Sequence, residues 1–215
     1  MSKKTPTIEE LMKLRTKTGE HHLDPANFDL LLDEMIVLKQ QLAEKETEIE
    51  GLQADAMSDP LTGLANRRTF EKEMERSLST ARRYERSHGL LLIDVNDFKS
   101  VNDRLGHVTG DKVLCHVARL LRQNIRSTDI AARLGGDEFC VILNELKSHR
   151  YALARAEAIA EAISRTPCVG EEHTVQISVS VGHYVFGGDD EIEDVLQRAD
   201  ESMYAQKARY QGEVD

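Results

Sequence analysis

The chain has 215 residues, with 28 lysines and arginines against 38 aspartates and glutamates, so its formal net charge is −10 at pH 7. That length allows one well-packed domain and an extension. The acidic balance argues against a surface for nucleic acid or an anionic membrane, and we expect neither as a partner.

The sequence also favours the cytoplasm as its location. No apolar run approaches the length of a membrane span, and the start of the chain lacks a signal-peptide core. The three cysteines are odd in number and widely spaced, which is typical of a reduced protein.

Residues 1–23 and 24–57 form two segments before the globular part. In 1–23, Thr7-Ile8-Glu9-Glu10 predicts the capping box of a short helix. In 24–57, apolar residues recur at alternating steps of four and three, which favours a parallel coiled-coil homodimer. The alternative is one amphipathic helix folded against the domain. The core positions would be Phe28, Leu31, Met35, Leu38, Leu42, Ile49, Leu52 and Ala56, with Lys45 at one d position.

Residues 58–215 show alternating helical and strand patterns. In chain order, the helices and strands expected from these patterns are a helix over Thr69–Arg86, a buried strand over Leu90–Ile93, a helix over Lys112–Ile125, apolar segments on both sides of Arg133–Glu138, a helix over Tyr151–Ser164, a strand over Thr174–Val181 and a helix over Ile192–Lys207. The full predicted order is α-β-α-α-β-β-α-β-α.

Acidic residues follow the buried strand Leu90–Ile93. Asp94 comes directly after it, at the kind of strand end where open α/β sheets place ligands. Further along, Gly135 and Gly136 precede Asp137 and Glu138 between two apolar segments, which predicts a β-hairpin turn. An ordinary solvated turn is the alternative. If the hairpin pairs beside the strand, Asp94 and Asp137 converge. A site whose ligands are all oxygen atoms favours Mg²⁺ or Mn²⁺. Such an ion at paired carboxylates is typical of phosphate chemistry.

Four motifs in series make the chain similar to the GGDEF-domain diguanylate cyclases over about residues 58–207. They are Asp59–Arg68, Asp94–Asp111, Gly135–Phe139 and Ala199–Lys207. The resemblance implies an α/β (α+β) fold, a ferredoxin-like palm similar to nucleotidyl cyclases with helices behind a mixed sheet, over 58–215. It also implies a homodimer that condenses two GTP into cyclic di-GMP and releases two pyrophosphates.

The resemblance assigns roles to residues of the site. Asp94 and Asp137, with the carbonyl of Val95, would hold two Mg²⁺ or Mn²⁺ ions. Glu138 would either accept the proton of the ribose 3′-hydroxyl or share the metal. The nucleotide would be bound by Lys99, the backbone N–H groups near Asp97 and Phe98, the guanine readers Asn102 and Asp111, and by His107 and Lys207.

Some of these residues have structural alternatives. Lys99 could be a solvated lysine, and Asn102-Asp103 could cap a helix. His107 could only brace its loop, and Asp111 could be the N-cap of the next helix. Two departures from the family pattern stand out: Asn96 replaces an acid, and Gln211 occupies the position of an arginine that contacts phosphate.

A regulatory motif precedes the hairpin. Arg126 and Asp129 match the spacing of the family's inhibitory site, where cyclic di-GMP would act as allosteric inhibitor. The alternative is that Arg126 ends a helix and Asp129 starts a strand. Arg150 and Arg155 are the candidates for a second arginine of this site.

Two other functions are considered beside the cyclase. One is a catalytically weak or inactive receptor that binds GTP or cyclic di-GMP and signals through its coil. The other is a structural coiled-coil adaptor, which would leave every motif after residue 57 without a purpose.

Overall fold

The computed structural model describes residues 35–45, 57–146, 148–170 and 173–214, and the chain divides into a unit over 1–52 and a second unit over 53–215. In the first unit, residues 35–45 form a helix whose residues are all exposed. Met35, Leu38 and Leu42, which occupy predicted coiled-coil core positions, are 39%, 56% and 59% exposed. The short helix predicted in 1–23 and the rest of the coil before residue 57 lie outside the described residues.

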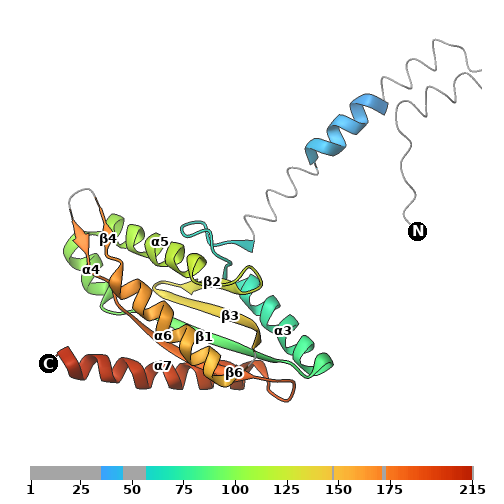
Figure 1. The fold of residues 1–215 in the computed structure, drawn as a ribbon. Coiled ribbons are helices and arrows are strands. Elements are labelled where there is room, and N and C mark those ends of the chain that lie inside the picture. The colour runs from blue at the N-terminus through green and yellow to red at the C-terminus, as the bar shows by residue number, and fades with distance from the viewer. Residues whose placement is uncertain (1–34, 46–56, 147, 171–172, 215) are drawn as a thin grey trace, which may run out of the picture. The chain divides into compact units, whose positions relative to one another are not determined.

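The second unit follows the predicted order of helices and strands, with one addition. Its elements are α3 (Arg67–Tyr84), β1 (Ser87–Val95), α4 (Phe98–Leu105), α5 (His107–Gln123), β2 (Ile130–Gly135), β3 (Glu138–Leu146), α6 (His149–Arg165), β4 (Cys168–Val169), β5 (Thr174–Val175), β6 (Val179–Phe186) and α7 (Ile192–Val214) (Figure 1). The addition is the small hairpin of β4 and β5. The α/β class and the palm-like order are confirmed.

The main sheet has the strand order β2-β3-β1-β6, and all three of its strand pairings are antiparallel. The predicted mixed sheet is therefore wrong. The connection from β1 to β2 passes over β3, and the connection from β3 to β6 passes over β1. No two strands joined by a helical crossover are neighbours, so no parallel pair forms.

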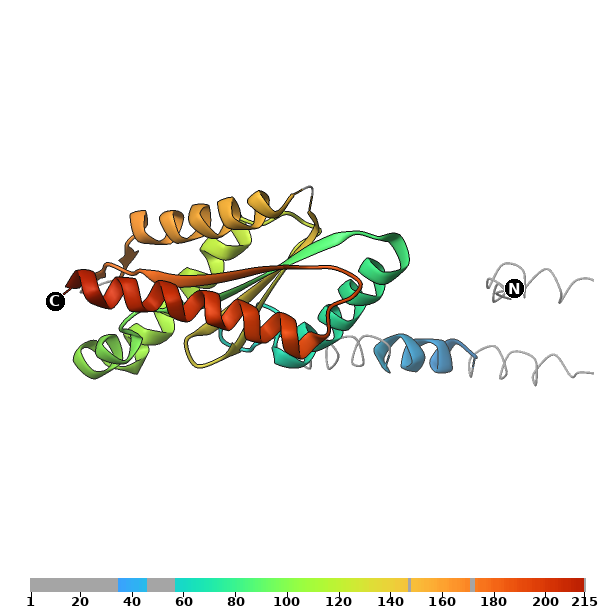
Figure 2. The same cartoon turned by 90° about the horizontal axis from the view of Figure 1, so that it is seen from below.

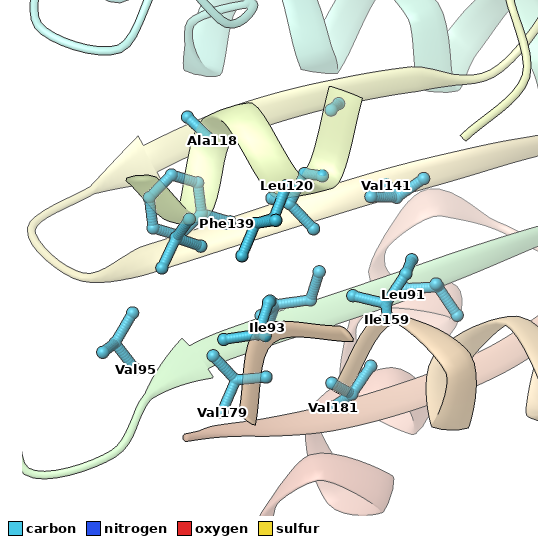
Figure 3. Close-up of a cluster of buried hydrophobic side chains, with 14 of the residues drawn as sticks. Leu91, Ile93, Val95, Ala118, Leu120, Phe139, Val141, Ile159, Val179 and Val181 are labelled. Carbon is cyan, nitrogen blue, oxygen red and sulfur yellow. The ribbon is translucent and has the colours of Figure 1, made fainter. Parts of the chain in front are cut away.

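Helices cover both faces of this sheet. Helices α5 and α6 pack on one face and α3 and α7 on the other, and Figure 2 shows α6 and α7 on opposite sides of the strands. Because side chains alternate along a strand, Leu91 and Ile93 of β1 pack on the first face and Leu90 and Leu92 on the second. Figure 3 shows Leu91 and Ile93 beside Ile159 of α6. The same alternation places Asp94 on the face covered by α7.

Helix α7 is fixed against β6, the edge strand of the sheet. A Cβ on Gly182 would lie 2.1 Å from the carbonyl oxygen of Ala199, so the missing side chain permits the close approach. The N–H of Val181 donates to Gln206 Oε1 (2.5 Å), and the N–H of His183 donates to Ser202 Oγ (3.2 Å). These bonds occupy edge donors that a further strand would otherwise pair with.

Two predicted boundaries are wrong. Helix α5 begins at His107 rather than Lys112, because Gly106 ends α4 and precedes α5 with a φ of 82°. The strand predicted over Thr174–Val181 is divided between β5, which pairs with β4, and β6, which pairs with β1. Its predicted inward face is nevertheless buried, at Val175, Ile177, Val179 and Val181.

Candidate active site

The carboxyl end of β1 meets the Gly-Gly turn of the β2–β3 hairpin. Asp94 is paired directly with Glu138 in the register of β1 and β3, and the N–H of Val95 donates to the carbonyl of Asp137 (3.3 Å). The turn uses positive φ angles at Gly135 (149°) and Gly136 (51°), which only glycine adopts readily. Directly opposed residues of an antiparallel pair point to the same face, so Asp94 and Glu138 share the face covered by α7.

The carboxylate of Asp94 is mostly buried and carries a cationic partner. Asp94 is 8% exposed, and the ammonium of Lys207 on α7 lies 2.7 Å from its Oδ1. Asp137 is half-buried and Glu138 is exposed. Among the residues that the structure describes, no three His, Cys, Asp or Glu side chains are grouped as a metal site.

These residues nevertheless fit a divalent cation by their chemistry. The predicted ligands offer only oxygen atoms, from three carboxylates and one carbonyl, as hard cations prefer. The ammonium of Lys207 shows that a cation already compensates the buried charge of Asp94.

The loop after β1 leads into α4 through an unusual backbone conformation. Asp97 has a φ of 55°, and its side chain makes no capping hydrogen bond to α4. The N–H groups of the first turn of α4 therefore follow a left-handed residue, an arrangement that favours anions. Lys99 is exposed in this turn, as the solvated alternative also predicts.

Asn96, the departure from an acid, is held by two serines. Its Nδ2 donates to Ser178 Oγ (3.0 Å), and Ser180 Oγ donates to its Oδ1 (2.7 Å). An amide can make both bonds as donor and acceptor, whereas an ionised carboxylate could only accept. The structure thus explains an asparagine here.

Asn102 and Asp111 lie on two consecutive helices, α4 and α5, which meet closely. A Cβ on Gly110, the residue before Asp111, would lie 1.9 Å from Asn102 Oδ1, so the glycine makes room for that amide. Both Asn102 and Asp103 lie within α4, and Asp111 lies within α5. The alternatives in which they cap helices are therefore wrong. His107 is exposed at the start of α5.

The sequence motif Asp59–Arg68 has a positioning role that sequence reasoning did not identify. Arg133 Nη1 lies 3.2 Å from both carboxylate oxygens of Asp59, and Arg133 Nη2 donates to the carbonyl of Gly136 (2.7 Å). Asp59 also accepts from the N–H (2.8 Å) and hydroxyl (2.6 Å) of Thr62. Burial alone would raise the pKa of Asp59, but the bonds from Thr62 and Arg133 outweigh it and lower the pKa below 3.8. Arg133 thereby ties the Gly-Gly turn to the start of the domain.

Arg126 and Asp129 lie at the other end of the sheet. Asp129 is 9% exposed, and its two oxygens accept from the N–H groups of Arg126 (3.0 Å) and Asn144 (3.1 Å). The guanidinium of Arg126 lies over the ring of Tyr151, 4.6 Å from its centre. Arg126 does not end a helix, since α5 ends at Gln123, and Asp129 precedes β2, which starts at Ile130, so neither part of the alternative is met.

Asn144 connects this loop to the core. Its Nδ2 donates to the carbonyl of Thr128 (2.6 Å), so its Oδ1 is the acceptor for His88 Nδ1 at 3.0 Å. Burial lowers the pKa of His88, which favours the neutral ring, and its Nδ1–H donates to Asn144 Oδ1.

A cavity of about 600 Å³ opens beside the loop. Its lining includes Arg126 and also Arg76 of α3, a second guanidinium that sequence reasoning missed. The two predicted candidates, Arg150 and Arg155, are not among the lining residues. Both lie on α6. Arg76 could not have been selected from the sequence, because only the packing of α3 on the sheet brings it to this end.

Known proteins are similar to this chain in sequence and in fold. A family model described as diguanylate cyclase, GGDEF domain, matches residues 56–213. The diguanylate cyclase TpbB of Pseudomonas aeruginosa is 36% identical over 187 residues, which cover 86% of this chain and 42% of TpbB. The diguanylate cyclase DosC of Escherichia coli is 36% identical over 158 residues, which cover 73% of this chain and 34% of DosC. The chain therefore matches less than half the length of either relative.

Solved structures agree with these matches. The coiled coil and GGDEF domain of DgcB from Caulobacter crescentus, in complex with c-di-GMP, has a TM-score of 0.77 at 28% identity, covering 83% of this chain and 94% of that chain. The GGDEF domain of TpbB has a TM-score of 0.68 at 38% identity, covering 71% of this chain and 89% of that chain. None of the helices in the described ranges is long and apolar enough to cross a membrane. The chain belongs to the diguanylate cyclase GGDEF-domain family.

Proposed function

We propose that this protein is a diguanylate cyclase. Each of two GTP molecules would use its 3′-hydroxyl to attack the α-phosphorus of the other. Two new phosphodiester bonds form, the bonds from the α-phosphorus atoms to the bridging oxygens break, and two pyrophosphates leave. One observation carries this proposal. Asp94 is paired directly with Glu138, and beside this pair the N–H of Val95 donates to the carbonyl of Asp137.

The residues at this strand end have complementary tasks in the proposed reaction. Asp94, Asp137 and the carbonyl of Val95 would hold Mg²⁺ or Mn²⁺, two ions per site. Bound there, the ions supply Lewis-acid stabilisation of the phosphate charge and lower the pKa of the attacking hydroxyl. Glu138 would either accept the hydroxyl proton or complete the metal ligands. Its exposure makes it accessible to a nucleotide.

The nucleotide would lie against α4 and α5. The backbone N–H groups at Asp97 and Phe98 would bind the β- and γ-phosphates, with Lys99 and Lys207 offsetting their charge. Asn102 and Asp111 would read guanine, because a carboxylate can accept from both its N1–H and its exocyclic amine. Adenine offers no such pair of donors, so we expect GTP rather than ATP. His107, exposed at the start of α5, would line the same site.

We also propose that the active species is a homodimer joined by a parallel coiled coil over 24–57. Each domain would bind one GTP, so reaction requires two domains that face each other. The exposed Met35, Leu38 and Leu42 of the described helix supply an apolar stripe for a second copy. Such a coil raises the effective concentration of the second half-site.

Cyclic di-GMP would inhibit the enzyme at Arg126 and Asp129. A guanidinium offers a planar donor pair for phosphate or for the Hoogsteen edge of guanine. The adjoining cavity of about 600 Å³ presents Arg76 as a second cation for the same ligand. The free Cys115, Cys140 and Cys168 suit the reducing cytoplasm, where we place this activity.

A second candidate function is a receptor that binds GTP or cyclic di-GMP without turnover. One observation favours it: the carboxylate of Asp94 is engaged by the ammonium of Lys207. The receptor would bind nucleotide but form no product, so one assay separates the two candidates.

The assay incubates the purified full chain with GTP and Mg²⁺ and resolves the nucleotides by chromatography. We expect cyclic di-GMP from the native protein and a rate about 10²- to 10³-fold lower for Asp137→Ala, the scale of losing one charge-stabilising group. The control is Asp189→Ala, an exposed acid in the loop between β6 and α7. Binding of GTP or added cyclic di-GMP without product formation would favour the receptor, and binding of neither nucleotide would refute both candidates.

Inhibition is tested in the same assay by adding cyclic di-GMP at the start. The native rate should fall, whereas Arg126→Ala should keep its rate at the same concentration of product. Equal inhibition of both proteins would remove Arg126 from the inhibitory site.

A further inference from the structure

Lys207 and Asp94 form an ion pair with each other, although in the proposed reaction they bind different ligands. The ammonium lies 2.7 Å from Asp94 Oδ1, and the two side chains are 37% and 12% exposed. Asp94 would bind a metal ion, and Lys207 would bind the phosphates of the nucleotide. A metal ion on Asp94 would compete with the ammonium of Lys207, and the phosphates of the nucleotide would offer that ammonium a second partner.

The backbone of Lys207 is held in place by neighbouring contacts. Gln206, the residue before it, accepts through its side chain from the N–H of Val181, and Gly182 packs against the carbonyl of Ala199, about two turns earlier in α7. The ion pair therefore forms between two fixed backbone positions. The flexible four-carbon stem of lysine can exchange partners without movement of the helix.

The charges at this position determine when such an exchange is favourable. Asp94 is buried opposite Glu138, and a buried carboxylate without a cation is costly. A divalent ion that arrives alone competes with the ammonium for this carboxylate and repels it. An ion that arrives with a triphosphate brings an anion for the displaced ammonium.

We propose, on the basis of the proposed function, that Lys207 is an exchangeable counter-ion of Asp94 that makes metal binding depend on the nucleotide. In the free protein it compensates Asp94 and weakens binding of the metal alone. In the complex it transfers to the phosphates and strengthens binding of the nucleotide. Lys207 thus has opposite effects on the binding of the two ligands.

The experiment measures both affinities on the full chain carrying Lys207→Gln. Mn²⁺ alone is titrated into nucleotide-free protein and followed by the electron paramagnetic resonance signal of free Mn²⁺. Then 3′-deoxyguanosine triphosphate, which lacks the attacking hydroxyl, is titrated at saturating Mn²⁺. The variant should bind Mn²⁺ alone about two- to fivefold more tightly and the nucleotide about two- to fivefold more weakly, as expected for a partly exposed ion pair.

Two control variants make the result specific. Lys207→Arg keeps a cation and should restore both affinities towards the native values. Lys72→Gln removes an exposed lysine from α3 and should change neither. An unchanged or weaker affinity for Mn²⁺ alone in Lys207→Gln overturns the proposal, and so does an unchanged affinity for the nucleotide.

Failure of the proposed function would look different. If the native protein forms no cyclic di-GMP, the two titrations still report the exchange, because neither requires turnover. If the native protein turns over GTP and the two titrations shift in the same direction, the cyclase stands and the exchange is refuted.

Discussion

Two mostly buried aspartates at opposite ends of the central sheet have different kinds of partners. Asp94, 8% exposed, is paired with the mobile ammonium of Lys207, whereas Asp129, 9% exposed, accepts from two fixed backbone N–H groups. A charge held by a flexible side chain can change partners, and a charge held by the backbone cannot. The difference agrees with the proposed role of Asp94 as a metal ligand, and it gives Asp129 a structural role in its loop beside the proposed role in inhibition.

The largest expected effect is on activity at Asp94. The substitution Asp94→Asn removes the anionic ligand and should lower the rate of cyclic di-GMP formation about 10²- to 10³-fold. The thermal midpoint should remain near the native value, since the amide oxygen can still accept from Lys207. Initial rates and thermal unfolding measured on the same preparation test this, and a large loss of stability with little loss of rate would reverse the comparison.

The next effect is on stability at Asp129. The substitution Asp129→Ala leaves the N–H groups of Arg126 and Asn144 without their acceptor, which should lower the free energy of unfolding by about 1–3 kcal/mol. Asp129→Asn keeps one acceptor oxygen and should lose less. Urea unfolding provides the measurement. If Asp129→Ala were as stable as the native protein, the Asp129 carboxylate would have no structural role and could serve only in ligand binding.

A smaller effect is expected on the KM for GTP, because the position of the Asn102 amide depends on Gly110. The Cβ of Gly110→Ala would displace the Asn102 amide, so the KM for GTP should rise roughly two- to tenfold, as for loss of one hydrogen bond. The value of kcat should be little changed. Gly187→Ala is the matched control, because a Cβ there meets no atom within 4 Å. Equal KM values in both variants would argue that Asn102 does not read the nucleotide.

The smallest effect is the pH dependence of the tie between Asp59 and Arg133. The lowered pKa of Asp59 stabilises the fold fully above pH 3.8, and this contribution is lost as the pH falls through the folded-state pKa. Arg133→Gln should therefore be less stable than the native protein by about 1 kcal/mol at neutral pH, and the difference should shrink below pH 3.8. Urea unfolding at several pH values tests this. A difference that is constant with pH would assign the effect to the Gly136 carbonyl alone.

Local patterns in the sequence predicted most of the fold. The run Leu90–Ile93 and the Gly-Gly turn identified the two strands whose ends meet, because burial and positive φ have direct sequence correlates. The start of α5 was missed, since Gly106, His107 and Gly110 are typical of a loop. Within α5, Gly110 packs against Asn102, a contact that only the folded structure shows.

The long-range ion pairs could not be predicted from the sequence. Lys207 and Asp94 are 113 residues apart, and Arg133 and Asp59 are 74 apart. No local sequence pattern predicts which lysine or arginine forms an ion pair with a given aspartate or glutamate. The family resemblance supplied a role for Lys207 towards phosphate, but its present partner follows from the packing of α7 on β6. For the same reason Arg76, rather than Arg150 or Arg155, lines the cavity beside Arg126.

We propose that two domains join two GTP molecules, each domain using the end of β1 and the hairpin turn. The most direct test is the stoichiometry of the reaction with Mg²⁺, measured as GTP consumed, cyclic di-GMP formed and pyrophosphate released. We expect two GTP lost and two pyrophosphates gained for each cyclic di-GMP. Release of inorganic phosphate with GDP, or GTP that remains unchanged while bound, would contradict it.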